Sequence, residues 1–254
     1  MKIRAITLDL DDTLWPVAAT IHAAEAALLQ HLKTAAPNTA THFNREAMMG
    51  WRKQVAAIHP ARKSDLSFLR REIIRLALSE HGDDPALAEG AFEVFFEARQ
   101  QVKLFDDTLP ALEKLAARLP IVALSNGNAD IKKIGIAHFF VGRVTSSTLP
   151  EVKPHLKVFE HAVSLAQSSL FETLHVGDDV ALDVLGAHRA GMKTAWIHRE
   201  SQSWEEAEQH QAKLHASWGL HVDPAVLARP HERPDFICTN LLSLVDALEN
   251  GSWL

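Results

Sequence analysis

Asp9 and Asp11 are separated by one residue and directly follow a short apolar stretch near the start of the chain. Transfer of a phosphoryl group to water needs a nucleophile, a proton donor for the leaving alcohol and positive charge against the phosphoryl oxygens. If the backbone curls after the apolar stretch, both carboxylates can face one cavity. Asp9 would then attack phosphorus, and Asp11 would protonate the leaving group and later activate water. Taken alone, the pattern Asp-x-Asp-Asp-Thr is also typical of a turn that ends a strand.

A second acidic group follows a later apolar stretch. Asp178 and Asp179 come after residues 174–176, and Asp183 lies about one helical turn beyond them. Mg²⁺ prefers oxygen ligands and often takes only one or two protein carboxylates, which Asp9 and Asp178 can supply. Asp179 and Asp183 would support these ligands or replace one of them, and the sequence does not rank the two. One of these acids can instead cap the helix that follows.

Ser125, Asn126 and Gly127 follow another apolar run, and Lys153 stands before Pro154. A hydroxyl and main-chain N–H groups bind phosphate oxygens when the backbone can approach closely, and Gly127 has no side chain to prevent this. Pro154 disfavours a helix at Lys153, so an ammonium in a loop can neutralise phosphate and keep the nucleophile ionised. Alone, these features are more often a turn and a solvated lysine. Their order between the two acidic groups favours phosphate binding.

Short apolar runs that end in polar residues predict the parallel strands needed to position these side chains. The expected strands are residues 3–10, 121–124, 143–145, 173–176, 194–198 and 235–238. Amphipathic stretches between them predict helices at 109–119, 156–166, 181–190 and 241–248. This alternation predicts an α/β fold, a Rossmann-like doubly wound parallel sheet with ligands at the carboxyl ends of its strands.

Residues 16–102 interrupt the alternation with amphipathic helical patterns, which predict an inserted all-helical cap domain. The α/β core domain would then comprise residues 1–15 and 103–254. Within the core, residues 200–234 form a polar stretch that we expect as a surface insertion, with a helix at 204–218 and a proline-rich connection after it.

Bulk composition narrows the class of protein. A chain of 254 residues with 47% hydrophobic content can bury a full core, and one cysteine, Cys238, excludes an internal disulfide. No secretion signal and no apolar run of roughly 18 residues is evident, so we expect a cytoplasmic protein without a membrane role. The net charge of −6 argues against general nucleic-acid binding, and the 15 histidines lack the spacing of a metal site. The oligomeric state stays open.

In their order along the chain, the four signals resemble the four motifs of the haloacid dehalogenase superfamily, and the helical insert stands where these proteins carry a type 1 cap. The resemblance implies hydrolysis of a phosphate ester through an aspartyl-phosphate on Asp9, with Asp11 as acid and base and Lys153 as a further catalytic residue. It also implies a Mg²⁺ cofactor, held by Asp9, Asp178 and the main-chain carbonyl of Asp11.

Three phrases are more closely similar to bacterial phosphatases of this superfamily that act on flavin mononucleotide or on the phosphorylated ribitylaminouracil intermediate of riboflavin synthesis. They are residues 8–14, residues 125–128, and residues 174–179 with 183–184 and 186–187. The resemblance therefore implies a small phosphorylated metabolite as the partner. Leu8, which replaces a common Phe, and the long segment 200–234 depart from that subgroup.

The cap residues that contact substrate are harder to predict. Trp15 follows the first acidic pair, and Trp51 and Arg52 lie on an expected cap helix. An aromatic platform with a cationic partner could hold a flat ring and its polar tail. The simpler interpretation places Trp51 inside the cap and Arg52 on a solvated face, whereas both interpretations are equally open for Trp15.

Other functions remain as alternatives. A phosphomutase, or a hydrolase of this superfamily that acts on a sugar phosphate or phosphoglycolate, would keep the same acid pair and cap. A 2-haloacid dehalogenase also uses an aspartate nucleophile but needs neither metal nor second acid, so Asp11 and Asp178 argue against it. A non-catalytic binding protein commonly loses an acid, the lysine or a metal ligand, and this chain retains all of them.

Overall fold

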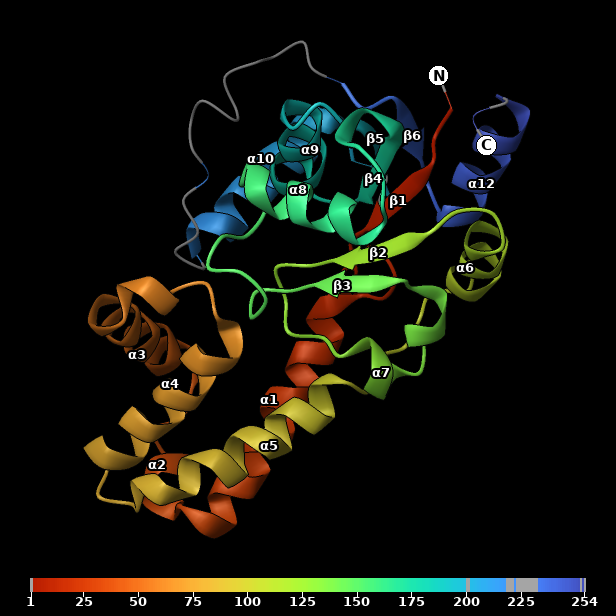
Figure 1. The fold of residues 1–254 in the computed structure, drawn as a ribbon. Coiled ribbons are helices and arrows are strands. Elements are labelled where there is room, and N and C mark those ends of the chain that lie inside the picture. Colours follow the sequence, from red (N-terminus) through yellow and green to blue (C-terminus); the bar gives the residue numbers. More distant parts are fainter. Residues whose placement is uncertain (1, 200–201, 218–221, 223–232, 252, 254) are drawn as a thin grey trace.

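A parallel sheet of six strands forms the centre of the computed structural model, which describes residues 2–199, 202–217, 222, 233–251 and 253 (Figure 1). The strand order is β3-β2-β1-β4-β5-β6, and each pairing is parallel. The strands are β1 (Ala5–Leu8), β2 (Ile121–Leu124), β3 (Gly142–Val144), β4 (Thr173–Gly177), β5 (Lys193–Ile197) and β6 (Phe236–Cys238). Each lies where the apolar pattern predicted a strand, with small shifts at the ends.

Helices cover both faces of the sheet, because successive residues of a strand point to opposite sides. Ile6 and Leu8 pack into the apolar cluster on the face covered by α6 (Thr108–Ala116), α7 (Ile131–Ile134) and α12 (Leu241–Asn250). Ala5 packs on the opposite face, which is covered by α8 (Leu156–Leu165) and α9 (Gly186–Arg189). The predicted doubly wound α/β fold is therefore confirmed.

The helices that follow β1 and precede α6 in the chain form a second body (Figure 1). These are α1 (Val17–Ala35), α2 (Pro37–Ala40), α3 (Arg45–Ile58), α4 (Leu66–Glu80) and α5 (Ala88–Arg99). Asn44 and Asp65 begin α3 and α4, because their side chains accept hydrogen bonds from N–H groups of the first turn. The apolar side chains of this body bury one another in a cluster of their own. That separation supports the division at residues 16–102, which stays a prediction.

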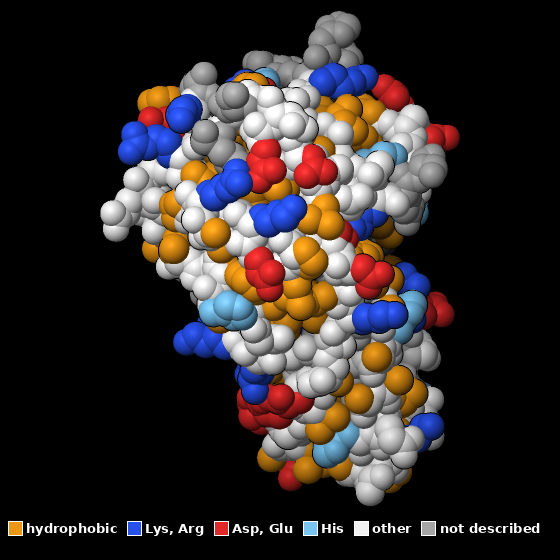
Figure 2. Space-filling model, turned by 90° about the vertical axis from the view of Figure 1, so that its right-hand side faces the viewer, with side chains coloured by type: hydrophobic (Ala, Val, Ile, Leu, Met, Phe, Trp, Pro, Cys, Tyr) orange, Lys and Arg blue, Asp and Glu red, His pale blue; other side chains and the backbone are white. Residues whose placement is uncertain are grey.

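The two bodies differ in width. Figure 2 shows the sheet-containing part as the wide upper half of the molecule and the helical part as the narrower lower half. On the face drawn there, basic and acidic side chains are interspersed rather than gathered into a stripe of one sign. None of the described helices combines the length and apolar character needed to cross a bilayer.

Helix α10 (Trp204–Ser217) comes from the predicted insertion and lies beside the core (Figure 1). The sequence predicted this helix over 204–218, and its last predicted residue lies outside the described ones, as does most of the connection that follows. Trp204 and Ala207 are buried in one cluster with Trp196 of β5. The helix is therefore attached to the core by an apolar contact.

The segment after β4 departs most from the prediction. The sequence indicated one helix over 181–190, whereas the chain first forms a π-helical turn, Val180–Leu185, and then α9. Asp179 caps this turn, because its Oδ1 accepts hydrogen bonds from the N–H groups of Ala181 and Leu182. The short helices α2 and α7 were not predicted, because four residues are too few to show a helical period.

Candidate active site

The carboxyl ends of neighbouring strands bring the sequence signals together. The last residue of β1, Leu8, pairs with Ala123 and Val176, each one residue before the end of β2 or β4. Asp9, Ser125 and Asp178 follow these three strands and therefore share one edge of the sheet. Lys153 reaches the same place from the turn between β3 and α8, with its Nζ 2.5 Å from Asp9 Oδ1.

Lys153 is held between two carboxylates. Its Nζ lies 2.5 Å from both Asp9 Oδ1 and Asp183 Oδ1, and all three side chains are buried. Burial alone would lower the pKa of Lys153, but the charges of Asp183 and Asp9 raise it above its usual value. Burial raises the pKa of Asp9 to about 8, although Lys153 opposes this. The single positive charge of Lys153 faces two carboxylates, so this group carries excess negative charge. A proton or a bound cation would reduce that charge.

Asp9, Asp178 and Asp183 form a cluster that could hold a metal ion, because one oxygen of each lies within 4.8 Å of the others. Burial, together with the charges of Asp9 and Asp183, raises the pKa of Asp178 well above its usual value. Thr13 Oγ1 lies 3.1 Å from Asp178 Oδ1 and 3.4 Å from Asp9 Oδ2. This all-oxygen set of donors fits a hard divalent cation such as Mg²⁺.

Asp183 is the most extensively bonded member of the cluster. Besides Lys153, its Oδ1 contacts His175 Nε2 at 2.9 Å, and its Oδ2 accepts a hydrogen bond from the Asp179 N–H at 3.1 Å. Burial alone would raise the pKa of Asp183, but Lys153 and His175 lower it. A Cβ on Gly177 would collide with the Asp183 carboxyl group. The glycine therefore leaves the space into which this side chain folds.

The structure separates the two acids that the sequence left unranked. Asp183 joins the cluster, whereas Asp179 caps the following turn and contacts His215 Nε2 at 2.6 Å. His175 is a partner that sequence reasoning missed. Its Nδ1 lies 2.8 Å from Thr7 Oγ1 of β1, and burial lowers its pKa, so a neutral ring connects the strand to Asp183. The one signal in the sequence was the position of His175 in the strand that ends just before Asp178 and Asp179.

The loop after β2 places Ser125 and Gly127 beside Asp11. Ser125 Oγ accepts the Gly127 N–H at 2.9 Å. A Cβ on Gly127 would lie 2.5 Å from Asp11 Oδ2 and 3.1 Å from Ser125 Oγ, so a larger residue would displace one of them. The Asn126 side chain instead pairs with the main chain of Lys153, donating to its carbonyl at 3.0 Å and accepting its N–H at 2.8 Å. Asn126 therefore joins this loop to the lysine loop.

Asp11 is held by residues that flank the helical body. Trp15 Nε1 donates to Asp11 Oδ1 at 2.8 Å, and Arg99 Nη2, from the end of α5, donates to both carboxylate oxygens at 2.6 and 2.8 Å. The Arg99 side chain is 1% exposed and that of Asp11 is 21% exposed. Sequence reasoning missed Arg99, whose one available signal was a basic residue at the end of the last cap helix.

Trp15 and Trp51 do not form the exposed aromatic platform that the sequence allowed. Trp15 is fully buried in the core, and its indole N–H is already bonded to the acid. Trp51 lies in the apolar cluster of the helical body, 5% exposed, and donates to Glu80 Oε2 at 2.6 Å. Arg52 is half-buried, and burial followed by the charge of Arg70 lowers its pKa. Two guanidinium groups of the cap therefore lie near each other.

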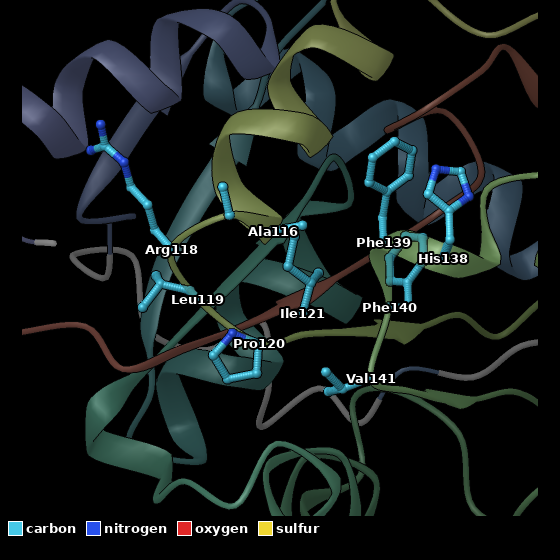
Figure 3. A pocket seen from close by; sticks show the side chains of 10 residues that line it. Ala116, Arg118, Leu119, Pro120, Ile121, His138, Phe139, Phe140 and Val141 are labelled. Carbon is cyan, nitrogen blue, oxygen red and sulfur yellow. The ribbon is translucent and has the colours of Figure 1, made fainter.

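Two hollows of the described surface lie away from this site. One of about 350 Å³ is at the amino-terminal end of β2, with the aromatic side chains of 138–140 on one side (Figure 3). Its lining residues are Ala116, Ala117, Arg118, Leu119, Pro120, Ile121, His138, Phe139, Phe140 and Val141. A second, of about 420 Å³, is lined by Lys2, Ile3, Arg4, Leu119, Phe171 and Glu172. Neither contains a predicted site residue, and neither brings acids together.

A class of hydrolases is defined by an aspartate directly after the first strand, a buried lysine and an acidic loop on a parallel sheet, with a helical body inserted after that strand. The family model for haloacid dehalogenase-like hydrolases matches residues 3–191. The chain belongs to this family.

Curated relatives and solved structures agree with the family. The 5-amino-6-(5-phospho-D-ribitylamino)uracil phosphatase YigB of Escherichia coli (strain K12) is 30% identical over 212 residues, which are 80% of this chain and 89% of that protein. A glyceraldehyde 3-phosphate phosphatase of Methanopyrus kandleri is 28% identical over 209 residues, 78% of this chain and 84% of that protein. The crystal structure of a 2-haloacid dehalogenase from Pseudomonas syringae pv. Tomato DC3000 has a TM-score of 0.84 and 31% identity, with 98% of this chain and 99% of that chain covered.

Proposed function

We propose that this chain is a Mg²⁺-dependent phosphatase that hydrolyses a small phosphorylated metabolite through an aspartyl-phosphate on Asp9. The observation that carries the proposal is the Lys153 ammonium, 2.5 Å from Asp9 beside a cluster of acids that could hold a cation. Relatives named as phosphatases of phosphorylated metabolites support the same reaction class.

In the first half of the reaction, a carboxylate oxygen of Asp9 bonds to phosphorus while the bond from phosphorus to the leaving oxygen breaks. Asp11 gives its proton to that oxygen, so the alcohol leaves neutral. Ser125 Oγ accepts the Gly127 N–H, so its own proton is available for a phosphoryl oxygen. Lys153 supplies positive charge beside the nucleophile.

In the second half, water attacks the phosphorus of the acyl phosphate. Asp11, now a carboxylate, takes a proton from this water, and the bond between phosphorus and Asp9 breaks. Inorganic phosphate leaves, and both acids return to their first state. Arg99 and Trp15, which donate hydrogen bonds to Asp11, would orient its carboxyl group in both steps.

Asp9 and Asp178 would hold the Mg²⁺, with the main-chain carbonyl of Asp11 as the third protein ligand implied by the family. When bound, the ion supplies positive charge against the phosphoryl oxygens. The raised pKa values of Asp9 and Asp178 support this assignment, because burial and crowding there favour a compensating charge. The carboxylate of Asp183 contacts Lys153 and would stabilise the positions of the two ligand carboxylates.

The decisive test is Asp9→Asn, which keeps the size of the side chain but removes the nucleophile. We expect the wild-type chain to hydrolyse p-nitrophenyl phosphate with Mg²⁺ and to stop when EDTA is added. The variant should show no turnover above background while its circular dichroism spectrum stays unchanged. Continued turnover by the folded variant would refute the mechanism.

For the substrate, the proposal extends to flavin mononucleotide or a related phosphate of riboflavin synthesis. The support is the sequence likeness to YigB, whose name states a ribitylaminouracil phosphate. Catalytic efficiencies for flavin mononucleotide, sugar phosphates, phosphoglycolate and nucleotides would test it. Equally weak turnover of the whole panel would remove the flavin assignment, and isomerised sugar phosphate in place of free phosphate would indicate a mutase.

A 2-haloacid dehalogenase is the second candidate, because the solved structure with a TM-score of 0.84 carries that name. Asp9 would then attack carbon and release halide, a reaction that gives no task to Asp11 or Asp178. We expect no chloride release from 2-chloropropionate in EDTA. Chloride release that disappears in Asp9→Asn would favour the dehalogenase instead.

A further inference from the structure

We propose that α10 positions the metal-binding loop after β4 through Gln211 and His215, and that the affinity of the chain for Mg²⁺ depends on this helix. The inference rests on the proposed function, because it takes Asp178 as a ligand of Mg²⁺. It assigns a task to the described part of the insertion at 200–234.

Gln211 bridges the backbone on both sides of Asp179. Its Oε1 accepts the N–H of Val180 at 2.8 Å, and its Nε2 donates to the carbonyl of Asp178 at 3.0 Å. Trp196 Nε1 also donates to that carbonyl, at 2.8 Å. One amide side chain thus pairs with the loop as a neighbouring strand would, and its removal leaves an N–H donor without this partner.

His215 holds the side chain between those two backbone groups. It is 3% exposed, and its Nε2 lies 2.6 Å from Asp179 Oδ2. The other oxygen of Asp179 accepts hydrogen bonds from the N–H groups of Ala181 and Leu182. The Asp179 carboxylate is therefore held from two sides, by the turn that it caps and by α10.

The contacts of α10 follow from its helical period. Gln211 and His215 are four residues apart, so they share one face of the helix, as do the buried Trp204 and Ala207. The apolar pair attaches the first turns of the helix to the core, and the polar pair reaches the loop. One face of α10 thus contacts both the apolar core and the loop that carries Asp178 into the carboxylate cluster.

Holding this loop matters because the direction of a ligand carboxylate follows from the backbone that carries it. Asp178 has its side chain in the acidic cluster and its carbonyl bonded to α10. Groups that orient metal ligands change metal affinity or activity by about 10–100-fold when they are removed. The family model ends at residue 191, so α10 lies beyond the part of the chain that the family match covers.

The test compares Gln211→Ala and His215→Ala with two controls on the same helix, Gln209→Ala and His210→Ala, whose side chains are exposed. Mg²⁺ binding to the full chain is measured by isothermal titration calorimetry, together with the Mg²⁺ concentration that gives half-maximal hydrolysis of p-nitrophenyl phosphate. Gln211→Ala and His215→Ala should each raise the Kd for Mg²⁺ by about 10-fold or more. The KM for p-nitrophenyl phosphate at saturating Mg²⁺ should stay unchanged, and the controls should match the wild type.

Gln211→Met keeps the volume of the side chain and its helix propensity, so it answers the question if Gln211→Ala does not fold. An unchanged Kd for Mg²⁺ in folded Gln211→Met would overturn the proposal. Failure of the proposed function would show differently, because the wild-type chain would then bind no Mg²⁺. A wild-type chain that binds Mg²⁺, with variants that bind it equally well, removes only the role of α10.

Discussion

Asp9 and Asp11, the proposed nucleophile and the proposed acid, are held by different parts of the molecule. The Asp9 side chain is 9% exposed and is bonded to Lys153, which the sheet and the turn before α8 position. The Asp11 side chain is 21% exposed and is bonded to Arg99, where α5 ends, and to Trp15, just before α1 begins. A displacement of the helical body would therefore change the surroundings of Asp11 while leaving Asp9 and Lys153 in place.

Lys153→Met should give the largest effect, because it removes the charge on the nucleophile side. We expect kcat for p-nitrophenyl phosphate to fall by about 10²-fold or more. The free energy of unfolding should fall by about 3–5 kcal/mol, because two buried carboxylates lose their partner. Urea denaturation and steady-state kinetics measure both quantities.

Lys157→Met is the matched control, because Lys157 is 65% exposed and pairs with Glu151 at the surface. It should change neither quantity. A Lys153→Met variant that keeps the wild-type kcat would contradict the proposed role of Lys153 beside the nucleophile.

Arg99→Met should affect only the part of the site that contains Asp11, the proposed acid. For an alkyl phosphate, whose leaving alcohol needs a proton, kcat should fall by about 10²-fold, the lower end of what general acid catalysis contributes. The loss should be smaller for p-nitrophenyl phosphate, because its leaving group departs as an anion. The free energy of unfolding should fall less than for Lys153→Met, because water can reach Asp11.

Arg99→Lys keeps a positive charge at the end of α5 and should recover part of the activity on the alkyl phosphate. Arg118→Met, at a residue that is 49% exposed, serves as the surface control. Equal losses for both leaving groups would show that Arg99 does not act through the acid.

Asp107→Asn should give the smallest effect. It tests the hydrogen bonds that hold the loop between Asp11 and α1. Arg199 donates to the Thr13 carbonyl at 2.7 Å and to Asp107 Oδ1 at 2.9 Å, and the Leu241 N–H donates to Asp107 Oδ2. Burial alone would raise the pKa of Asp107, but the hydrogen bonds that it accepts from Arg199 and Leu241 lower it. A lowered pKa stabilises the fold above the unfolded value and loses that contribution as the pH falls through the folded value.

The wild type should therefore be more stable than Asp107→Asn at neutral pH, and the difference should shrink below about pH 4, near the pKa of an unfolded aspartate. Urea denaturation at a series of pH values measures this difference. A difference that does not vary with pH would show that the carboxylate charge is not what holds the loop.

The sheet and the convergence of the motifs could be predicted from the sequence, because apolar runs end directly before Asp9 and Ser125 and one residue before Asp178. Parallel strands place such ends at one edge, whatever the rest of the chain does. The membership of Asp183 in the cluster could not be ranked above that of Asp179. That distinction depends on a π-helical turn, which leaves no periodic signal in the sequence.

Pairings that involve residues outside the four sequence motifs were beyond sequence reasoning. Arg99 and Asp11 are 88 positions apart, and only the return of α5 to the sheet brings them together. The contacts of α10 with the loop after β4 were hidden for the same reason, since a polar helix with scattered histidines is also typical of a solvated surface. Trp15 shows a further limit, because its residue type allowed both an exposed ring and a buried one, and the fold decided between them.

The hydrogen bond from the indole of Trp15 to Asp11 makes this side chain an internal reporter. Its N–H gives a nuclear magnetic resonance signal distinct from the backbone, and the chemical shift follows the strength of the hydrogen bond that it donates. The signal should therefore move whenever the carboxylate exchanges partners during turnover. The orientation of the acid could thus be followed in real time without any label that disturbs the site.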